Sequence, residues 1–563
     1  IGSGATRGQG QLGLMGWLTA VPVWTLLIGL GTFGCWVAIS MSPLSKRRLP
    51  FQIREAAILT TAGFVILLAL VALAPSTGNG MAWDGLMYHL PTIAAWIHQG
   101  RIAPVPSIPF SNYPMGLNLL FVPGMMAGGQ PETAQLVHLS TGILAMLATY
   151  LLARQLIAKD WDILAALSFW LLPLVQQEAT WPMNDLGLVF YATLALLALV
   201  RWQKEPSTGW LVVSGAMVGF AASVKVTAVF PVAALSILVL ALSWRAAGQG
   251  WRRVLRIWLA FGLPLALVGG WWYLKNLIQL GNPFFPFLFD YFGGAFWTEA
   301  ANERFRLSQV GRGLQLPLWA QIVLILAGLV YLIGLIRFVR LKPAWKILLT
   351  YPVMFGLSWL MTESPQSRYL LPLFPVFLVI FWGMVAFALE YVPIAVRPSL
   401  FYLLMLLGVL LSAGLVIRNQ QAELAVALGR TERETYLTRG FYMYPAYQFA
   451  NSQLPSHSKL LIFPEDRTYY LDREYLWGDP ISQGVIEYAD YDTAAEFLAD
   501  LQDQDITHIV LSQPAYQFFV NWESHDARLV NYMKTAHQLL VNLTDTQASL
   551  VFEQNGVEIY ALP

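Results

Sequence analysis

The chain has 563 residues, of which 56% are hydrophobic and 12% are charged. Soluble domains carry about 25% charged residues, so this composition indicates a polytopic α-helical membrane protein. A formal net charge of +1 gives no concentrated basic surface for nucleic-acid binding, and a single cysteine, Cys35, excludes a disulfide framework or a thiolate metal site.

Hydropathy predicts about twelve transmembrane helices, because a helix needs about 20 apolar residues to cross a bilayer. Alternate connections between them are rich in Lys and Arg, as in SKRRLPFQIR and WRAAGQGWRRVLR, and cytoplasmic loops carry such an excess. The loop 76–130 and the turns EATWPMND and TESPQSRYLLP are therefore expected on the opposite, outer face, with the loop 277–316. The predicted spans are 15–41, 55–75, 131–155, 161–177, 186–202, 208–224, 227–244, 254–276, 317–337, 346–362, 371–390 and 399–417.

Charge and hydropathy divide the chain into three parts. Residues 1–54 are predicted to hold an extra N-terminal transmembrane helix and a cytoplasmic loop. Residues 55–417 are predicted to be a transmembrane domain with the outer loop 76–130, in which 113–126 is a short interfacial helix. Residues 418–563 carry 20 acidic and 9 basic residues and are predicted to be a separate acidic domain in water on the same outer side.

The last part has the pattern of a small α/β domain. KLLIF and ITHIVLS are β-branched, buried runs typical of strands, and TAAEFLADLQDQ between them is an amphipathic helix. Asn555-Gly556 stands between alternating apolar runs, which predicts a β-hairpin.

Two acids stand at the outer ends of predicted helices. Asp84, in AWDGLMYHLP, follows the second span, and Asp185, in WPMNDLGLVF, begins a later one. A carboxylate in a partly desolvated pocket can act as a general base toward a hydroxyl or an amine. Each acid can instead cap the helix that follows it, and both interpretations stay open here.

Two cations lie at outer turns without an acid nearby in the sequence. They are Lys225, in AASVKVTAVFP, and Arg368, in SPQSRYLLPLFP. Arg binds phosphate in a bidentate way and Lys binds it as a point charge, so the pair predicts recognition of a phosphate. The alternative is that each side chain snorkels to lipid headgroups.

Further polar and aromatic side chains on the outer face are possible substrate contacts, although His89 also suits a packing or hydrogen-bonding role. With Asp84 and Asp185, three of them could offer ligands to a divalent cation, but we expect no required cofactor and no metal. The aromatic runs GNPFFPF and WWYLKN fit an interfacial belt, to which no catalytic role is assigned. The possible substrate contacts are Tyr88, His89, Tyr113, Asn184, Glu178 and Tyr369.

These motifs, in this order, resemble the polyprenyl-phosphate-dependent membrane glycosyltransferases of the GT-C fold. The motifs are WDGLMYHLP, the ND at the start of a span, a lysine at a later outer turn, GNPFFPF and SRYLLPLFPV, within residues 55–400. The nearest relatives are similar to protein O-mannosyltransferases and the aminoarabinose lipid A transferase. Many relatives carry two adjacent acids in the first outer loop, whereas here Gly85 follows Asp84.

The resemblance implies an inverting glycosyltransferase in a bacterial inner membrane, with the last domain in the periplasm. A hexosyl or pentosyl group would pass from a polyprenyl-phosphate donor to a lipid, glycan or protein acceptor. Asp84 matches the catalytic acid of the first loop, Asp185 the second outer acid, and Lys225 and Arg368 the positions that meet the donor phosphate. The expected partners are the lipid-linked sugar and membrane lipids, with protein partners possible in a membrane complex.

Two other functions remain open. A chain can keep the GT-C fold as a non-catalytic structural or accessory subunit of a membrane complex. A transporter would place acids or broken helices near the middle of the membrane, whereas the candidate acids here gather at the outer face.

Overall fold

The computed structural model describes residues 51–563, apart from 129, 158–160, 246–249, 310–321, 323–325, 327–340, 363–365, 389–396 and 522–525. The predicted helix 15–41 with Cys35, and nearly all of the predicted helix 317–337, lie outside the described residues.

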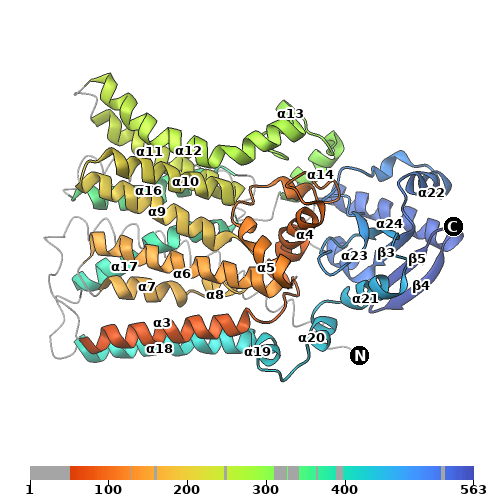
Figure 1. Ribbon diagram of the computed structural model, residues 1–563, viewed down its shortest axis with the longest axis horizontal. Coiled ribbons are helices and arrows are strands. Elements are labelled where there is room, and N and C mark those ends of the chain that lie inside the picture. Colours follow the sequence, from red (N-terminus) through yellow and green to blue (C-terminus); the bar gives the residue numbers. More distant parts are fainter. Residues whose placement is uncertain are drawn as a thin grey trace.

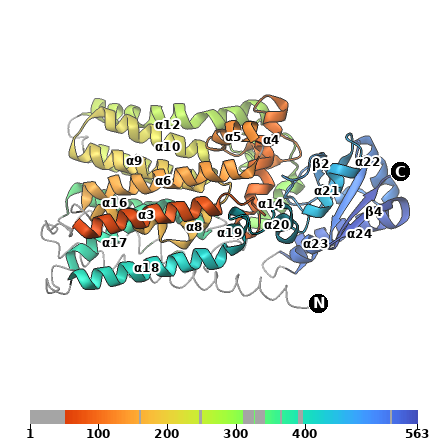
Figure 2. The same cartoon turned by 60° about the horizontal axis from the view of Figure 1, so that its bottom comes forward.

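Most of the described helices form one bundle whose axes follow the long direction of the molecule (Figures 1 and 2). Five described helical segments are long and apolar enough to cross a membrane, which agrees with a helical membrane protein. The number of about twelve spans stays a prediction. The bundle helices are α3 (Phe51–Val71), α6 (Pro131–Leu156), α7 (Trp161–Trp170), α8 (Pro173–Glu178), α9 (Asp185–Lys204), α10 (Thr208–Val224), α11 (Val229–Arg245), α12 (Trp251–Leu280), α16 (Pro343–Leu360), α17 (Phe374–Ala388) and α18 (Arg397–Asn419).

One predicted span is wrong as a single helix. Residues 161–177 form α7 and α8 with a break after Trp170, and Pro173 occupies the start of the second helix. Proline lacks the backbone N–H of a helix interior but fits the first helical turn, so it begins a new helix here.

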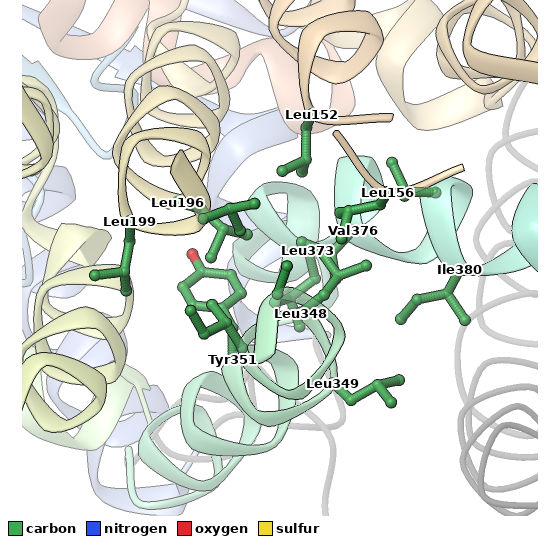
Figure 3. Packing of buried hydrophobic residues seen from close by; sticks show 14 of the residues in the cluster. Leu152, Leu156, Leu196, Leu199, Leu348, Leu349, Tyr351, Leu373, Val376 and Ile380 are labelled. Carbon is green, nitrogen blue, oxygen red and sulfur yellow. The ribbon is translucent and has the colours of Figure 1, made fainter. Parts of the chain in front are cut away.

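The centre of the bundle is packed mainly by apolar side chains, with a few buried hydroxyls such as those of Thr193 and Ser214. Figure 3 shows Tyr351 and Leu348 of α16 facing Leu196 of α9 and Leu152 of α6. Lipid tails are as apolar as these side chains, so close van der Waals contact rather than hydrophobic burial stabilises such a core. The helices α10 and α12 approach each other closely, since a Cβ on Gly215 would lie 2.0 Å from the carbonyl oxygen of Phe261.

The loop 76–130 folds over one end of the bundle, between the bundle and the C-terminal sheet (Figure 1). Its elements are η1 (Gly80–Ala82), η2 (Gly85–His89), α4 (Leu90–Gln99), η3 (Pro109–Asn112), η4 (Asn118–Leu120) and α5 (Phe121–Gly128). The element η2 is a π-helix, in which the N–H of Leu90 donates to the carbonyl oxygen of Gly85. The helix predicted over 113–126 begins only at Asn118, and its position in a membrane interface stays a prediction.

Four shorter elements complete this end of the bundle: η5 (Val226–Ala228), α13 (Phe289–Phe292), α14 (Glu299–Gln309) and η7 (Ser367–Leu373). We call it the sheet end, because the C-terminal sheet lies beyond it in Figure 1.

The C-terminal part contains a five-stranded sheet in the order β2-β1-β3-β5-β4. The predicted strands over KLLIF and ITHIVLS are confirmed, and they pair in parallel. The predicted helix begins with a capping box between Thr493 and Glu496, and the predicted hairpin turns at Asn555-Gly556, where both residues have positive φ. The elements are α19 (Gln421–Ala427), α20 (Arg433–Gly440), α21 (Tyr444–Gln453), β1 (Lys459–Phe463), β2 (Glu474–Trp477), α22 (Ala494–Asp503), β3 (His508–Ser512), α23 (Gln513–Val520), α24 (Ala527–Gln547), β4 (Ser549–Gln554) and β5 (Val557–Ala561).

Candidate functional site

Asp84 and Arg368 form an ion pair at the sheet end. The Nη2 atom of Arg368 donates to Oδ2 of Asp84 at 2.9 Å, and the two side chains are 14% and 19% exposed. Asp84 precedes the π-helix η2, but its side chain makes no capping hydrogen bond. The interpretation of Asp84 as a helix cap is therefore wrong, because its carboxylate faces a cation from another element.

Asp185 and Lys225 form a second ion pair. The Nζ atom of Lys225 lies 2.6 Å from Oδ2 of Asp185, and both side chains are buried. Asn184, rather than Asp185, occupies the N-cap position of α9, so the cap interpretation of Asp185 is also wrong. Lys225 follows α10 in an extended conformation, which ends that helix and places its side chain at the turn.

The two pairs belong to one electrostatic cluster. Burial raises the pKa of Asp84, but the positive charges of Arg368 and Lys225 outweigh that effect and lower it below its ordinary value of 3.8. Both predicted phosphate-binding cations are thus already paired with carboxylates, which the spacing along the chain did not indicate.

A chain of amides fixes the proton on His89. Asn184 donates through Nδ2 to Oδ1 of Asn118, so the Nδ2 of Asn118 faces Nδ1 of His89, at 2.9 Å. Nδ1 therefore accepts, and the hydrogen of the neutral ring is on Nε2, which has no hydrogen-bond partner among the described residues. Burial, reinforced by the charge of Lys225, lowers the pKa of His89 to about 3, so the ring is neutral at pH 7.

Glu178 and His138 lie beside the Asp185–Lys225 pair. The Nδ1 of His138 donates to the carbonyl oxygen of Trp181, and its Nε2 accepts from the N–H of Leu186, so this ring holds the turn before α9. Glu178 is fully buried, and neither carboxyl oxygen has a hydrogen-bond partner among the described residues. Burial, with the nearby charge of Asp185, raises its pKa well above 4.5, which favours the neutral acid.

Two of the predicted aromatic residues, Tyr88 and Tyr369, lie beside the first ion pair, and a third, Tyr113, packs against Tyr88. The hydroxyl of Tyr88 lies 3.4 Å from Oδ2 of Asp84. The rings of Tyr88 and Tyr113 meet edge to face, with 5.8 Å between their centroids, and the guanidinium of Arg368 lies 5.6 Å from the ring centroid of Tyr369. The structure therefore brings the predicted site residues together at one end of the bundle, although their roles stay predictions.

Lys275 is a buried cation that the sequence did not single out. It lies near the end of α12, is 4% exposed, and donates to Oδ1 of Asn112 at 3.3 Å, next to Tyr113. No carboxylate in the described part of the chain lies within ion-pairing distance of its Nζ atom. A lysine inside the aromatic run WWYLKN was the available signal, but the run was interpreted as an interfacial belt.

The glycine after Asp84 has a packing role. A Cβ on Gly85 would lie 2.8 Å from Cγ of Pro182, a rigid ring in the turn before α9. The two outer segments pack directly here, which explains why this chain has no second acid at that position.

Within the described ranges, no group of three or more His, Cys, Asp or Glu side chains is arranged to hold a metal ion. Asp84 and Asp185 are instead placed against cations.

Comparisons with known proteins bear on the fold. A family model described as a domain of unknown function (DUF8201) matches residues 133–305. No curated protein sequence matches the chain. ArnT from Cupriavidus metallidurans in the apo state is similar in structure, with a TM-score of 0.55 and 15% identity over 90% of this chain and 98% of ArnT.

ArnT bound to undecaprenyl phosphate gives a TM-score of 0.56 and 16% identity over the same shares of the two chains. The apo oligosaccharyltransferase of Archaeoglobus fulgidus gives a TM-score of 0.46 and 13% identity over 89% of this chain and 74% of that one. The conclusion about the fold rests on the ArnT structures. This chain is a helical membrane protein with the GT-C fold.

Proposed function

We propose that this chain is an inverting glycosyltransferase that moves a sugar from a polyprenyl-phosphate donor to a lipid, glycan or protein acceptor. The observation that carries the proposal is the cluster of two acid–cation pairs at the sheet end. It occurs in a fold similar to that of ArnT, which has been solved with undecaprenyl phosphate. We place the chain in a bacterial inner membrane, with the sheet end and residues 418–563 at the periplasmic face.

Asp84 is proposed as the general base. In the transfer step, the acceptor oxygen or nitrogen bonds to the anomeric carbon, the bond from that carbon to the phosphate oxygen breaks, and Asp84 takes the acceptor proton. Such a step needs a carboxylate near the acceptor and a stabilised leaving phosphate.

Arg368 links the basicity of Asp84 to the binding of the phosphate. It is paired with Asp84 in the free protein, and a phosphate would compete with that carboxylate for the guanidinium. When the phosphate pairs with Arg368, Asp84 loses the positive charge that lowers its pKa. Burial then raises the pKa of Asp84. Donor binding would thus turn a weakly basic carboxylate into a stronger base.

The other charged residues have supporting roles in this proposal. Lys275, which has no carboxylate partner among the described residues, is proposed as the first cation to meet the phosphate. Asp185 is proposed to hold Lys225 in place rather than to react, because their pair is buried and short. No metal is needed, since Asp84 supplies the base and the cations stabilise the leaving group.

Binding of undecaprenyl phosphate to the purified protein in detergent micelles tests the phosphate site. Undecaprenol, which has the same chain without the phosphate, is the matched ligand. We expect measurable preference for the phosphate, loss of that preference in Lys275→Met, and retention of it in Lys534→Met, an exposed lysine on α24. Equal binding of the two lipids would refute the phosphate site.

Asp84→Asn separates binding from chemistry. The change removes the carboxylate that competes for Arg368, so undecaprenyl phosphate should bind more tightly than to the wild type. Transfer from undecaprenyl-phosphate sugars should be lost in the same variant. Weaker binding, or unchanged transfer, would contradict the roles assigned to Asp84 and Arg368.

The accessory-subunit function is favoured by one observation, which is that both predicted phosphate-binding cations are neutralised by carboxylates. A subunit of that kind needs no phosphate selectivity. The lipid comparison therefore also separates the two functions.

A further inference from the structure

The segment that leads from α3 to Asp84 is held by the C-terminal part of the chain. The hydroxyl of Tyr470 donates to the carbonyl oxygen of Ser76 at 2.6 Å. Asn79 donates through Nδ2 to the carbonyl oxygen of Gly440 at 2.7 Å, and its Oδ1 accepts from Nη1 of Arg467 at 3.2 Å. Hydrogen bonds thus fix residues 76–79 to a region more than 360 positions away.

The contact reaches the residue immediately before Asp84. The Nε1 atom of Trp83 donates to Oδ1 of Asp466 at 2.5 Å. The guanidinium of Arg467 lies 3.7 Å from the centroid of the Trp83 ring, within the range of a cation–π interaction. The indole therefore has both its N–H and its face fixed by two consecutive residues after β1.

The support behind this contact is rigid. Arg467 donates to Glu465 through Nε and Nη2, each at 2.8 Å, and both side chains are at most 2% exposed. The hydroxyl of Tyr442 also donates to Glu465. A bidentate, buried pair leaves little rotational freedom to either partner, so the guanidinium offers Trp83 a fixed surface.

Gly78, in the same segment, is tightly packed. Gly78 has φ of +65°, and a Cβ there would lie 2.8 Å from Cδ1 of Leu86 and 3.0 Å from Cδ of Arg467. Leu86 belongs to η2, directly after Asp84. Gly78 therefore lies close both to Arg467 of the C-terminal part and to a residue that follows Asp84.

We propose that Glu465, Asp466 and Arg467 are positioning residues for Asp84, and that the C-terminal part is thereby a working component of the active site. The inference rests on the proposed function, in which Asp84 is the base. These residues act through Trp83, whose backbone continues directly into Asp84. A base held about 1 Å away from its productive place can lose on the order of 100-fold in rate, which sets the scale of the effect.

The test uses the full-length protein with Trp83→Phe and Asp466→Ala. Trp83→Phe keeps a smaller aromatic face for Arg467 and removes the N–H that donates to Asp466. Both variants should lower kcat about 10- to 100-fold with little change in KM for the donor, because the base is misplaced while the binding groups remain. Asp466→Asn keeps an oxygen that accepts from Trp83 and should restore most of the kcat lost in Asp466→Ala.

Glu487→Gln is the matched control. Glu487 pairs with Arg304 at 2.7 Å, so this change also weakens a contact between the C-terminal part and an outer segment, but not the one that leads to Asp84. Its kcat should stay near that of the wild type. An equal loss of kcat in Glu487→Gln, or a rise in KM without a loss of kcat in Trp83→Phe, would refute a positioning role.

Amide hydrogen exchange gives a measurement that does not depend on transfer. Exchange over residues 76–90 should be faster in Trp83→Phe and Asp466→Ala than in the wild type and in Glu487→Gln. If wild-type protein transfers no sugar but exchange responds in this way, only the proposed function fails. Unchanged exchange in Trp83→Phe, which leaves the C-terminal part intact, would overturn the inference itself.

Discussion

The buried pair of Lys225 and Asp185 provides a quantitative test of the site. Their charged atoms are 2.6 Å apart, and the side chains are 10% and 4% exposed. With an effective dielectric constant of about 20, Coulomb's law gives an attraction of about 6 kcal/mol at this distance. Desolvation costs several kcal/mol for each ion, so the intact pair contributes little net stability. If one residue of the pair is replaced, the other still bears its desolvation cost but no longer gains the Coulomb attraction.

Lys225→Met should therefore lower the free energy of unfolding by about 3–5 kcal/mol, because it leaves Asp185 buried and unpaired. Asp185→Asn should have a similar effect through the unpaired lysine. The double variant should recover most of the loss, since neither charge remains. The assay is unfolding of the purified protein in mixed micelles by increasing SDS, followed by circular dichroism.

An exposed pair gives the control for this cycle. Arg528 and Glu303 are 65% and 62% exposed, and Arg528→Met should leave the free energy of unfolding close to that of the wild type, because exposed ion pairs contribute little. If the two single changes at Lys225 and Asp185 add in the double variant, the residues are energetically independent and the paired site is refuted.

Three further predictions follow from the same region. Burial raises the pKa of Asp84 but the charge of Arg368 leads the effects that bring it below 3.8. The pair therefore stabilises the folded protein above the ordinary pKa of 3.8, and this stabilisation is lost as the pH falls through the lowered folded-state pKa. The thermal unfolding midpoints of wild type and Asp84→Asn should differ by a constant amount from about pH 8 to 5 and converge as the pH falls below 3.8. Burial, with neighbouring carboxylates, raises the pKa of Asp466 well above 3.8. Ionised Asp466 therefore destabilises the folded protein as the pH rises, whereas protonated Asp466 does not. Asp466→Asn should unfold at a higher temperature than the wild type at about pH 8 but not near pH 3. Gly85→Ala puts a Cβ against the ring of Pro182 and should lower the free energy of unfolding in SDS by about 1–3 kcal/mol; an unchanged value would show that the turn yields without cost.

Local patterns predicted much of this fold. Period and composition identified the strand KLLIF and the helix over TAAEFLADLQDQ, because side-chain alternation and amphipathicity are properties of a few consecutive residues. Asn555-Gly556 predicted its hairpin for the same reason. The break between α7 and α8 was missed, although Pro173, a residue that favours the first turn of a helix, was the available signal.

The pairing within the site could not be predicted in this way. Asp84 and Arg368 are 284 positions apart, and only the packing of the bundle brings them to 2.9 Å. Hydropathy located both residues on one face, but it gives no distance between side chains on that face. Lys275 was missed because an aromatic neighbourhood has the same composition whether it faces lipid or buries a cation.

The π-helical turn of η2 gives the length of this segment a meaning of its own. A π-helical turn closes with one more residue than an α-helical turn, and here that wider turn begins immediately after Asp84. Loss of one residue from Gly85–His89 would leave a sequence still able to form an ordinary helix. It would also rotate everything before the deletion by about 100° relative to α4. The direction of the Asp84 carboxylate thus depends on the number of residues in Gly85–His89. A deletion there would turn Asp84 away from Arg368 although Asp84 itself is unchanged.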